Sequence, residues 1–274
     1  MFLQNMLTND VNALSSNQAQ LTGFCNPKGR LLAIFQLIRR TEDYLILLPS
    51  DLAAFISQRL SMFKLRSKVD IALCDDLYPI GLLDPISLVD PVESWYGQNT
   101  PEGLVIRQPG DKARYLLIAD ETGLNNLKDW LNDDWLIGAE EFWQSQNIQA
   151  GLPAVFESTK EAFTPQQVNL DLVGGVSFKK GCYPGQEVVA RLHYLGTPSR
   201  RMFLAKLQDS RLPSPHTVVC DKAGEVLGHV VQAQFDEASE VLCQLTMKLA
   251  TDLSEATIND SAVDSLIPLA QDER

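Results

Sequence analysis

The segment KKGCYPGQEVVAR, residues 179–191, holds the residue types best suited to chemistry. Cys182 follows two lysines, Lys179 and Lys180, and has a glycine on each side within three positions. Thiolate is the reactive form of cysteine, and nearby positive charge stabilises it. A helix beginning after Gly185 would add the partial positive charge of its N-terminus. The pattern predicts a flexible, electropositive surface loop around a functional thiol, with a buried, purely structural Cys182 as the alternative.

The neighbouring residues suggest how that loop is held. Gly181 would let the backbone approach another group closely, and Gly185 permits a positive φ. If EVVARL is helical, Glu187 and Arg191 lie one turn apart and are placed to form an ion pair. His193 is too near in sequence to be identified as an acid–base partner by spacing, so a Cys–His pair depends on the fold.

Composition limits the possible classes of protein. The 274 residues carry a net charge of −12, which disfavours general binding to a phosphate backbone. No apolar run approaches the ~20 residues of a membrane span, and no signal peptide is evident. The five cysteines are widely spaced and include no CxxC pair: Cys25, Cys74, Cys182, Cys220 and Cys243. A disulfide framework and a structural zinc site are therefore not expected, and the four cysteines other than Cys182 are interpreted as structural.

The elements that must position Cys182 follow from periodicity and turn signals. Residues 31–38 and 44–48 predict a hairpin, and residues 51–60, 121–131 and 139–148 predict amphipathic helices. Strands are predicted at 68–74 and 113–119. Prolines crowd between Tyr78 and Gly110, where long regular structure is not expected, and residues 152–177 are predicted to be loop. Short strands after Met202 predict a small C-terminal barrel or sandwich.

The segment LGGVSFKKGCYPGQEVVAR resembles the signature of the YgfZ family, whose core pattern is K-G-C-[FY]-x-G-Q-E-x-x-x-R. Every fixed position is present, as Lys180, Gly181, Cys182, Tyr183, Gly185, Gln186, Glu187 and Arg191. FLQNMLTNDV resembles the N-terminal segment of the family, with Asn5 in place of the usual glycine. CNPKGRLL, AGLPAV and TPQQVNL resemble further family segments, so the likeness extends to about residue 205.

The resemblance implies an α+β fold similar to the T-protein of the glycine cleavage system. That fold has two α/β domains around a central folate channel, plus a C-terminal β-barrel. We expect residues 1–195 to form the folate-binding region and residues 196–274 the barrel. The family carries a further N-terminal segment with a strand and a tryptophan that contacts folate. This sequence begins at Met1, so we expect either that this strand is absent or that the start of the sequence is misassigned.

The resemblance also implies function. The family consists of folate-binding accessory proteins that support iron–sulfur enzymes, including the radical enzyme that methylthiolates tRNA, and its motif cysteine, here Cys182, is the critical residue. A tryptophan linked to folate falls at Trp143, so tetrahydrofolate or a related reduced folate is the expected cofactor. Iron–sulfur enzymes and cluster-assembly proteins are the expected partners, in the cytoplasm. A folate-dependent aminomethyl transferase is the alternative function, and the KGCY motif favours the accessory role.

Two expected absences complete the interpretation. One cysteine cannot hold a cluster that usually takes four thiolates, so no stably bound metal is expected. Lys179, Lys180, Arg191, Arg200 and Arg201 are the densest basic positions and could form a local patch. Because the rest of the chain is acidic, we expect no direct binding of nucleic acid and no membrane partner.

Overall fold

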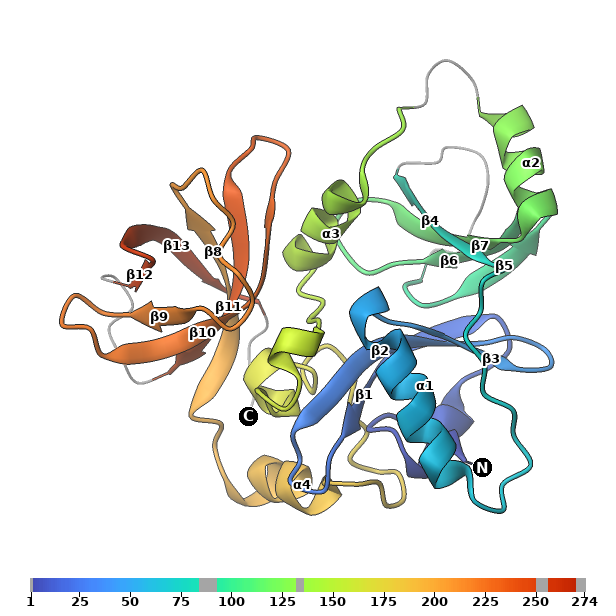
Figure 1. The fold of residues 1–274 in the computed structure, drawn as a ribbon, viewed down its shortest axis with the longest axis horizontal. Coiled ribbons are helices and arrows are strands. Elements are labelled where there is room, and N and C mark those ends of the chain that lie inside the picture. Colours follow the sequence, from blue (N-terminus) through green and yellow to red (C-terminus); the bar gives the residue numbers. More distant parts are fainter. Residues whose placement is uncertain (1, 84–92, 132–135, 250–255, 270–274) are drawn as a thin grey trace.

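The computed structural model describes residues 2–83, 93–131, 136–249 and 256–269, and Figure 1 shows their arrangement. Two small sheets lie on one side, a barrel lies on the other, and helix α3 (Glu140–Gln149) lies between the barrel and the second sheet. We refer to everything before the barrel as the body.

The first sheet is antiparallel, in the order β1-β2-β3. Its strands are β1 (Gln18–Cys25), β2 (Leu31–Arg39) and β3 (Tyr44–Leu47). β1 and β2 are buried along most of their length because the segments before β1, helix α1 (Ser50–Lys64) and the loop after residue 152 cover the sheet. Nearly continuous burial explains why Leu31–Ile38 of β2 are apolar except for Gln36, rather than alternating between apolar and polar.

The second sheet is also antiparallel, in the order β4-β7-β6-β5, and helix α2 (Glu121–Trp130) follows its strand β7. Its strands are β4 (Tyr78–Leu83), β5 (Gly97–Thr100), β6 (Gly103–Arg107) and β7 (Arg114–Ala119). Pro79 lies in β4 at the edge of the sheet, where a missing amide donor is tolerated. Asp120 starts α2 by accepting a hydrogen bond from the Gly123 amide at 2.8 Å.

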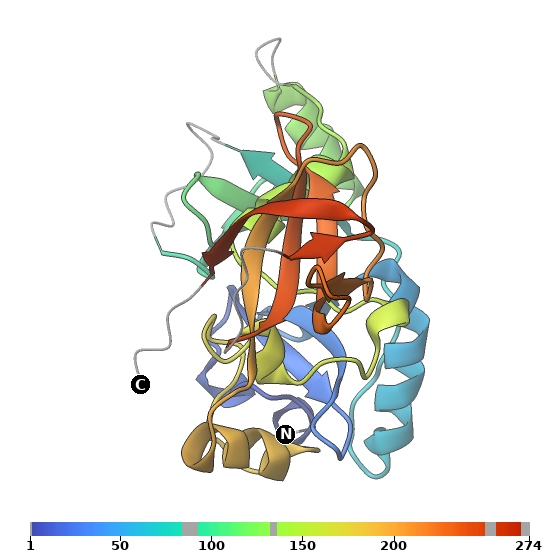
Figure 2. The same cartoon turned by 90° about the vertical axis from the view of Figure 1, so that its left-hand side faces the viewer.

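The barrel closes in the order β10-β11-β8-β13-β12-β9 around its own apolar core, and it faces the viewer in Figure 2. Its strands are β8 (Arg200–Leu207), β9 (Val218–Cys220), β10 (Val226–Phe235), β11 (Val241–Lys248), β12 (Thr257–Ile258) and β13 (Ser261–Pro268). Full closure removes exposed sheet edges, so short strands suffice.

Buried polar contacts join the barrel to the body. Arg201 at the start of β8 forms a bidentate ion pair with Asp171, at 2.7 and 3.1 Å, and both side chains are buried. Asn169 exchanges hydrogen bonds with the backbone of Met202 at 2.9 and 3.0 Å. Gln244 in β11 donates to the carbonyl of Ile148 in α3 at 3.0 Å. Helix α4 (Gln186–Leu195) lies within the stretch of chain between Asp171 and Arg201, at the end of the body far from α3 (Figures 1 and 2).

The structure corrects two expectations about local structure. The strand predicted at residues 68–74 is wrong, because this segment connects α1 to β4 without pairing to another strand. In its described residues, the proline-rich region from Tyr78 to Gly110 contains no long element, but it supplies the three short strands β4, β5 and β6, which the proline count did not indicate. Within the described ranges, no helix has the length and apolar character needed to cross a membrane.

Candidate functional site

Cys182 lies in an exposed loop just before α4, and its thiol is free. Its exposure argues against the alternative of a buried, purely structural cysteine. Cys25 and Cys243 are the buried ones, and burial raises the pKa of each thiol to about 12. Cys74 was expected to be structural and is instead exposed, donating to Asp76 at 3.1 Å. In the described parts of the chain, no group of three or more Cys, His, Asp or Glu residues could hold a metal ion.

Lys180 holds the loop from inside. Its ammonium group donates to the backbone carbonyls of Gln4 and Leu7, the latter at 2.5 Å, and lies 5.2 Å from the centroid of the Tyr183 ring. The residue is 8% exposed, and burial lowers its pKa to about 8. The sequence analysis placed both Lys179 and Lys180 beside the thiol. The ammonium of Lys180 instead points inward to the N-terminal segment, which leaves Lys179 as the exposed lysine next to the loop.

Gly185 is where the backbone makes its close approach. Its φ of +80° places it in the left-handed region before the first turn of α4. A Cβ there would lie 2.5 Å from the carbonyl oxygen of Asn26 and 2.7 Å from Gly29 Cα. The CNPKGR turn and the start of α4 are therefore packed backbone against backbone. The close approach expected at Gly181 does not occur, because a Cβ at that position would meet nothing within 4 Å.

The remaining motif residues have mixed roles. Tyr183 is buried, its hydroxyl has no hydrogen-bond partner among the described residues, and burial raises its pKa. Gln186 begins α4 and is half-buried. Glu187 and Arg191 are both exposed, and the expected ion pair between them is not among those formed by the described residues.

Packing defines the surroundings of His193 and of the basic positions near the loop. His193 stacks on Phe178 with ring centroids 3.6 Å apart and an interplanar angle of 9°. The five basic positions do not form one exposed patch, because Lys180 and Arg201 are buried and hydrogen-bonded. Lys179 and Arg191 are the exposed members, and Arg200 is half-buried.

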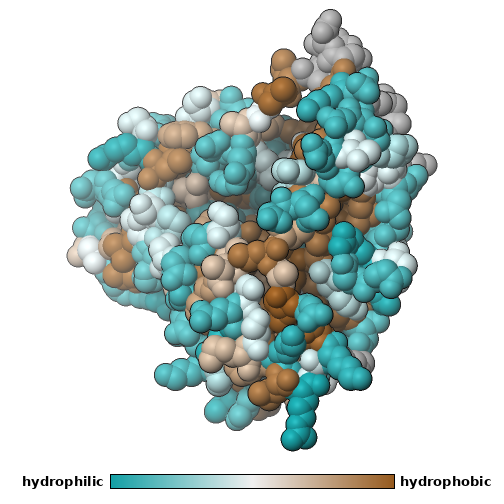
Figure 3. All heavy atoms as spheres, turned by 45° about the vertical axis from the view of Figure 1, so that its right-hand side comes forward, coloured by the Kyte–Doolittle hydropathy of each residue, from teal (hydrophilic) through white to brown (hydrophobic). Residues whose placement is uncertain are grey.

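A second candidate site is a cavity of about 1240 Å³ between the two sheets and α3. Its walls come from β1, β2, β3, β4, β7, α3 and the loop after Leu152, and Gln232 of the barrel contributes to the lining. Figure 3 shows apolar side chains gathered in a hollow on this face of the molecule. Concave, mostly apolar spaces with a few polar groups are typical of small-molecule sites.

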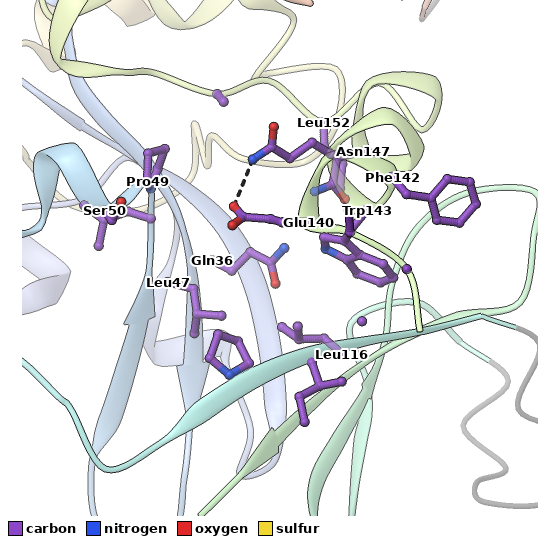
Figure 4. Close-up of a pocket in the computed structure, with 18 of the residues that line it drawn as sticks. Gln36, Leu47, Pro49, Ser50, Leu116, Glu140, Phe142, Trp143, Asn147 and Leu152 are labelled. Atoms are coloured by element: carbon purple, nitrogen blue, oxygen red, sulfur yellow. Dashed lines mark hydrogen bonds between the residues drawn. The ribbon is translucent and has the colours of Figure 1, made fainter. Parts of the chain in front are cut away.

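Trp143 projects from α3 into this cavity, as Figure 4 shows. The Arg114 guanidinium lies 4.8 Å from the centroid of the indole, and Arg114 also donates to Asn147 at 2.8 Å. Gly81 in β4 makes room for the ring, since a Cβ there would lie 2.3 Å from an indole carbon. The tryptophan is therefore fixed by an aromatic–cation contact and by a glycine in the facing strand.

The polar groups of the cavity were missed in the sequence analysis. Gln36 faces the cavity, and its Oε1 atom is buried without a hydrogen-bond partner in the described structure. Its amide donates to Gln108 at 3.0 Å, and the Gln108 Nε2 atom is likewise unpartnered. Glu140 accepts from Gln144 at 2.9 Å at the cavity wall. Gln36, Gln108 and helix α3 lie far apart in the sequence, so only the fold reveals that they are neighbours.

Cys182 does not line the cavity that Trp143 lines. The loop precedes α4, whereas Trp143 is on α3, and Figure 1 shows these two helices well apart. The two residues singled out from the sequence therefore belong to two separate sites.

Comparison with known proteins identifies the class first. The chain has the fold of the glycine cleavage T-protein: the aminomethyltransferase T of the glycine cleavage system from Bartonella henselae superimposes with a TM-score of 0.67. The superposition covers 97% of this chain and 79% of that one, at 14% identity. No family model matches the sequence.

Curated sequences narrow this class. The chain is 29% identical over 284 residues to the tRNA-modifying protein YgfZ of Klebsiella pneumoniae (strain 342), and the same values hold for YgfZ of Shigella boydii (strain Sb227) and Escherichia coli (strain UTI89). Each alignment covers 99% of this chain and 83% of the relative. The resemblance to the YgfZ family seen in the motifs is therefore confirmed and extends through the barrel.

Proposed function

We propose that this protein binds a reduced folate in the Trp143 cavity and uses Cys182 to support iron–sulfur enzymes, including the radical enzyme that methylthiolates tRNA. The observation that supports this proposal most directly is the large cavity with Trp143 on its wall, in a chain whose curated relatives are named tRNA-modifying proteins. The aminomethyltransferase fold alone does not carry that enzyme's activity to this chain.

The residues of the cavity suit a folate. The indole of Trp143 offers a flat apolar surface on which a pterin or aminobenzoyl ring can stack. The unpartnered Oε1 of Gln36 can accept a hydrogen bond from a ring amino group. A bound reduced folate would supply one-carbon or redox chemistry, and the residues of the chain would bind and orient it.

Fluorescence titration with tetrahydrofolate tests the cavity. We expect wild type to show quenching, Trp143→Phe to lose most of it, and Trp95→Phe to keep it, because Trp95 does not line the cavity. Gly81→Ala displaces the indole without removing it, and we expect affinity to fall by roughly tenfold. Equal quenching in the wild type and in Trp143→Phe would place the binding elsewhere.

Cys182 is the second part of the proposal. An exposed thiol on a loop anchored by Lys180 and Gly185 is accessible to a protein partner while its backbone stays fixed. It can serve as one ligand of a cluster shared with that partner, or as a transient redox or sulfur-handling thiol. The five free cysteines favour a reducing compartment, and we propose the cytoplasm.

Complementation in cells that lack the endogenous homologue tests the thiol. We expect Cys182→Ser to lose support of iron–sulfur enzyme activity while remaining folded, and Cys74→Ser, which also removes an exposed thiol, to retain it. Full activity of Cys182→Ser would refute the role of the thiol and leave the folate titration unaffected.

The effect on tRNA is proposed to be indirect. The net charge of −12 repels a polyanion, and burial of Lys180 and Arg201 removes two of the five expected basic contacts. A filter-binding assay at ~150 mM salt should show no binding in the micromolar range. Micromolar affinity that is lost in Lys179→Glu would contradict this part of the proposal.

A further inference from the structure

A small cavity of about 170 Å³ lies where the body meets the barrel, apart from both sites described above. The body contributes Arg30, the last residue of the CNPKGR turn, and a loop that includes Phe163. The barrel and the segments leading into its strands contribute Arg200, His216, His229 and Thr246. We propose that this cavity binds a tetrahedral oxyanion of the phosphate class.

Two of its donors are buried and lack partners. Thr246 is 1% exposed, and its hydroxyl has no hydrogen-bond partner among the described residues. The Nε atom of Arg200 is also buried without a partner. Leaving such groups unpaired in the interior is unfavourable, and more so for a charged group. An acceptor placed between them removes that cost.

The other polar groups add positive charge or can acquire it. Arg30 uses one nitrogen to donate to the carbonyl of Ala162 at 2.8 Å, which fixes the guanidinium at the cavity wall. His216 and His229 stack with ring centroids 4.7 Å apart and an interplanar angle of 12°. None of the described residues that line the cavity is acidic. Two guanidinium groups and two imidazoles therefore face one small space without a counter-charge there.

The pKa of His229 reflects this imbalance. Burial lowers the pKa of His229, and the neighbouring His216 and Arg200 lower it further. A bound anion would reverse that effect and favour protonation of both rings. Protonated imidazoles would then act as further donors to the same anion.

Size and chemistry together define the ligand class. A volume of about 170 Å³ far exceeds the ~10–15 Å³ that one water needs, and it lies below the ~300–1,000 Å³ of pockets that hold drug-sized ligands. Water could satisfy the hydroxyl, but it would leave the guanidinium charges uncompensated. A phosphate has several acceptor oxygens and a charge that matches a fork of arginine donors. Because the lining comes from both sides, the anion would join the barrel to the body.

Histidine NMR gives a direct test, because the chain has only three histidines and His193 lies outside the cavity. Sodium phosphate is titrated against a sodium chloride series of equal ionic strength. We expect phosphate to shift the ring signals of His216 and His229 with half-saturation at roughly 1 mM or below, to raise their pKa values, and to leave His193 unmoved.

Variants locate the binding. Arg200→Gln should weaken the phosphate response at least tenfold, and Thr246→Val, which removes only the hydroxyl, should weaken it severalfold. Arg211→Gln is the matched control, since its side chain is 80% exposed and lies outside the cavity. Thermal melting confirms that each variant is folded, and phosphate should raise the melting temperature of the wild type and of Arg211→Gln.

Two outcomes would overturn the proposal. Equal shifts at all three histidines, or the same shifts with chloride at matched ionic strength, would show a diffuse ionic effect. A phosphate response unchanged in both Arg200→Gln and Thr246→Val would place the anion elsewhere. Methyl phosphate is the second probe: binding comparable to that of phosphate indicates the terminal group of a larger ligand, and binding of inorganic phosphate alone indicates the free anion.

Discussion

Around Cys182, three residues of the sequence motif hold a loop in place, whereas around Trp143 a wide cavity is assembled from residues scattered along the chain. Lys180, Tyr183 and Gly185 are buried or packed against other segments, and the cysteine itself is exposed. Trp143 instead contacts Gly81 and Arg114, which lie in two other elements. A compact motif thus marks an exposed side chain, whereas Trp143 is the one residue of the cavity that the sequence singled out.

The largest expected contrast is in thiol reactivity. With iodoacetamide at pH 7.5, Cys182 should be alkylated at least a thousandfold faster than Cys25 and Cys243. Burial raises the pKa of both buried thiols from 9.0 to about 12, which lowers their thiolate population on the order of a thousandfold, and it also blocks access. Mass spectrometry of a time course measures the rates.

Cys74 is the internal control for exposure. It is exposed like Cys182, but its hydrogen bond to Asp76 raises its pKa, so it should react more slowly than Cys182 and faster than the buried pair. If Cys182 reacts as slowly as Cys25, its thiol is not accessible in solution. The contrast between an exposed thiol and the buried motif residues around it would then be wrong.

The two glycines beside Cys182 provide the next contrast. Gly185→Ala should reduce the free energy of unfolding by about 2–3 kcal/mol, because the left-handed backbone disfavours a side chain and the new Cβ meets the Asn26 carbonyl. Gly181→Ala should stay within about 0.5 kcal/mol, because its Cβ enters open space. Urea unfolding measures both. Similar losses of unfolding free energy in the two variants would contradict the contrast between the packed Gly185 and the exposed Gly181.

Replacing the buried lysine should have a slightly smaller effect. Lys180→Met leaves the carbonyls of Gln4 and Leu7 without their donor and should cost about 2 kcal/mol at pH 7, whereas the exposed Lys179→Met should cost less than about 0.5. At pH values between the Lys180 pKa of about 8 in the folded protein and the ordinary value of 10.5, the lysine is protonated in the unfolded chain and largely deprotonated in the folded protein. Stability of the wild type relative to Lys180→Met should therefore rise with pH across this interval.

Urea titrations at pH 7, 9 and 10.5 measure that trend. If the difference in the free energy of unfolding between the wild type and Lys180→Met becomes smaller as the pH rises, the two carbonyls stabilise the charged ammonium by more than burial destabilises it. The pKa of Lys180 in the folded protein would then lie above its ordinary value rather than below it.

Local patterns predicted the elements that carry their own signals. The helices at 121–130 and 140–149 follow from apolar periodicity, and the barrel follows from short strands between turns. The segment 68–74 shows the limit: Val69 and Ile71 suit an extended chain, but periodicity does not report whether a partner strand lies alongside. The orientation of Lys180 was unpredictable for the same reason, since its partners are about 175 positions away in sequence.

The candidate sites divide in the same way. Cys182 and Trp143 were identified because the family resemblance names them, while Gln36, Arg114 and Asn147 were not. Their relevance depends on the approach of β2, β7 and α3, which no local pattern encodes. Long-range packing, rather than residue type, decides which polar groups share a cavity.

The ion pair between Asp171 and Arg201 has a topological consequence. It closes the intervening chain, with Cys182 and α4 inside it, into a loop whose two ends are fastened in the interior. Closing a free loop of this length costs on the order of 3 kcal/mol in chain entropy, and folding has already met that cost before any partner arrives. A protein that binds at the thiol therefore contacts a loop that is already ordered at both ends, rather than a disordered segment. The binding free energy of that protein is therefore not reduced by the full entropic cost of ordering a mobile segment.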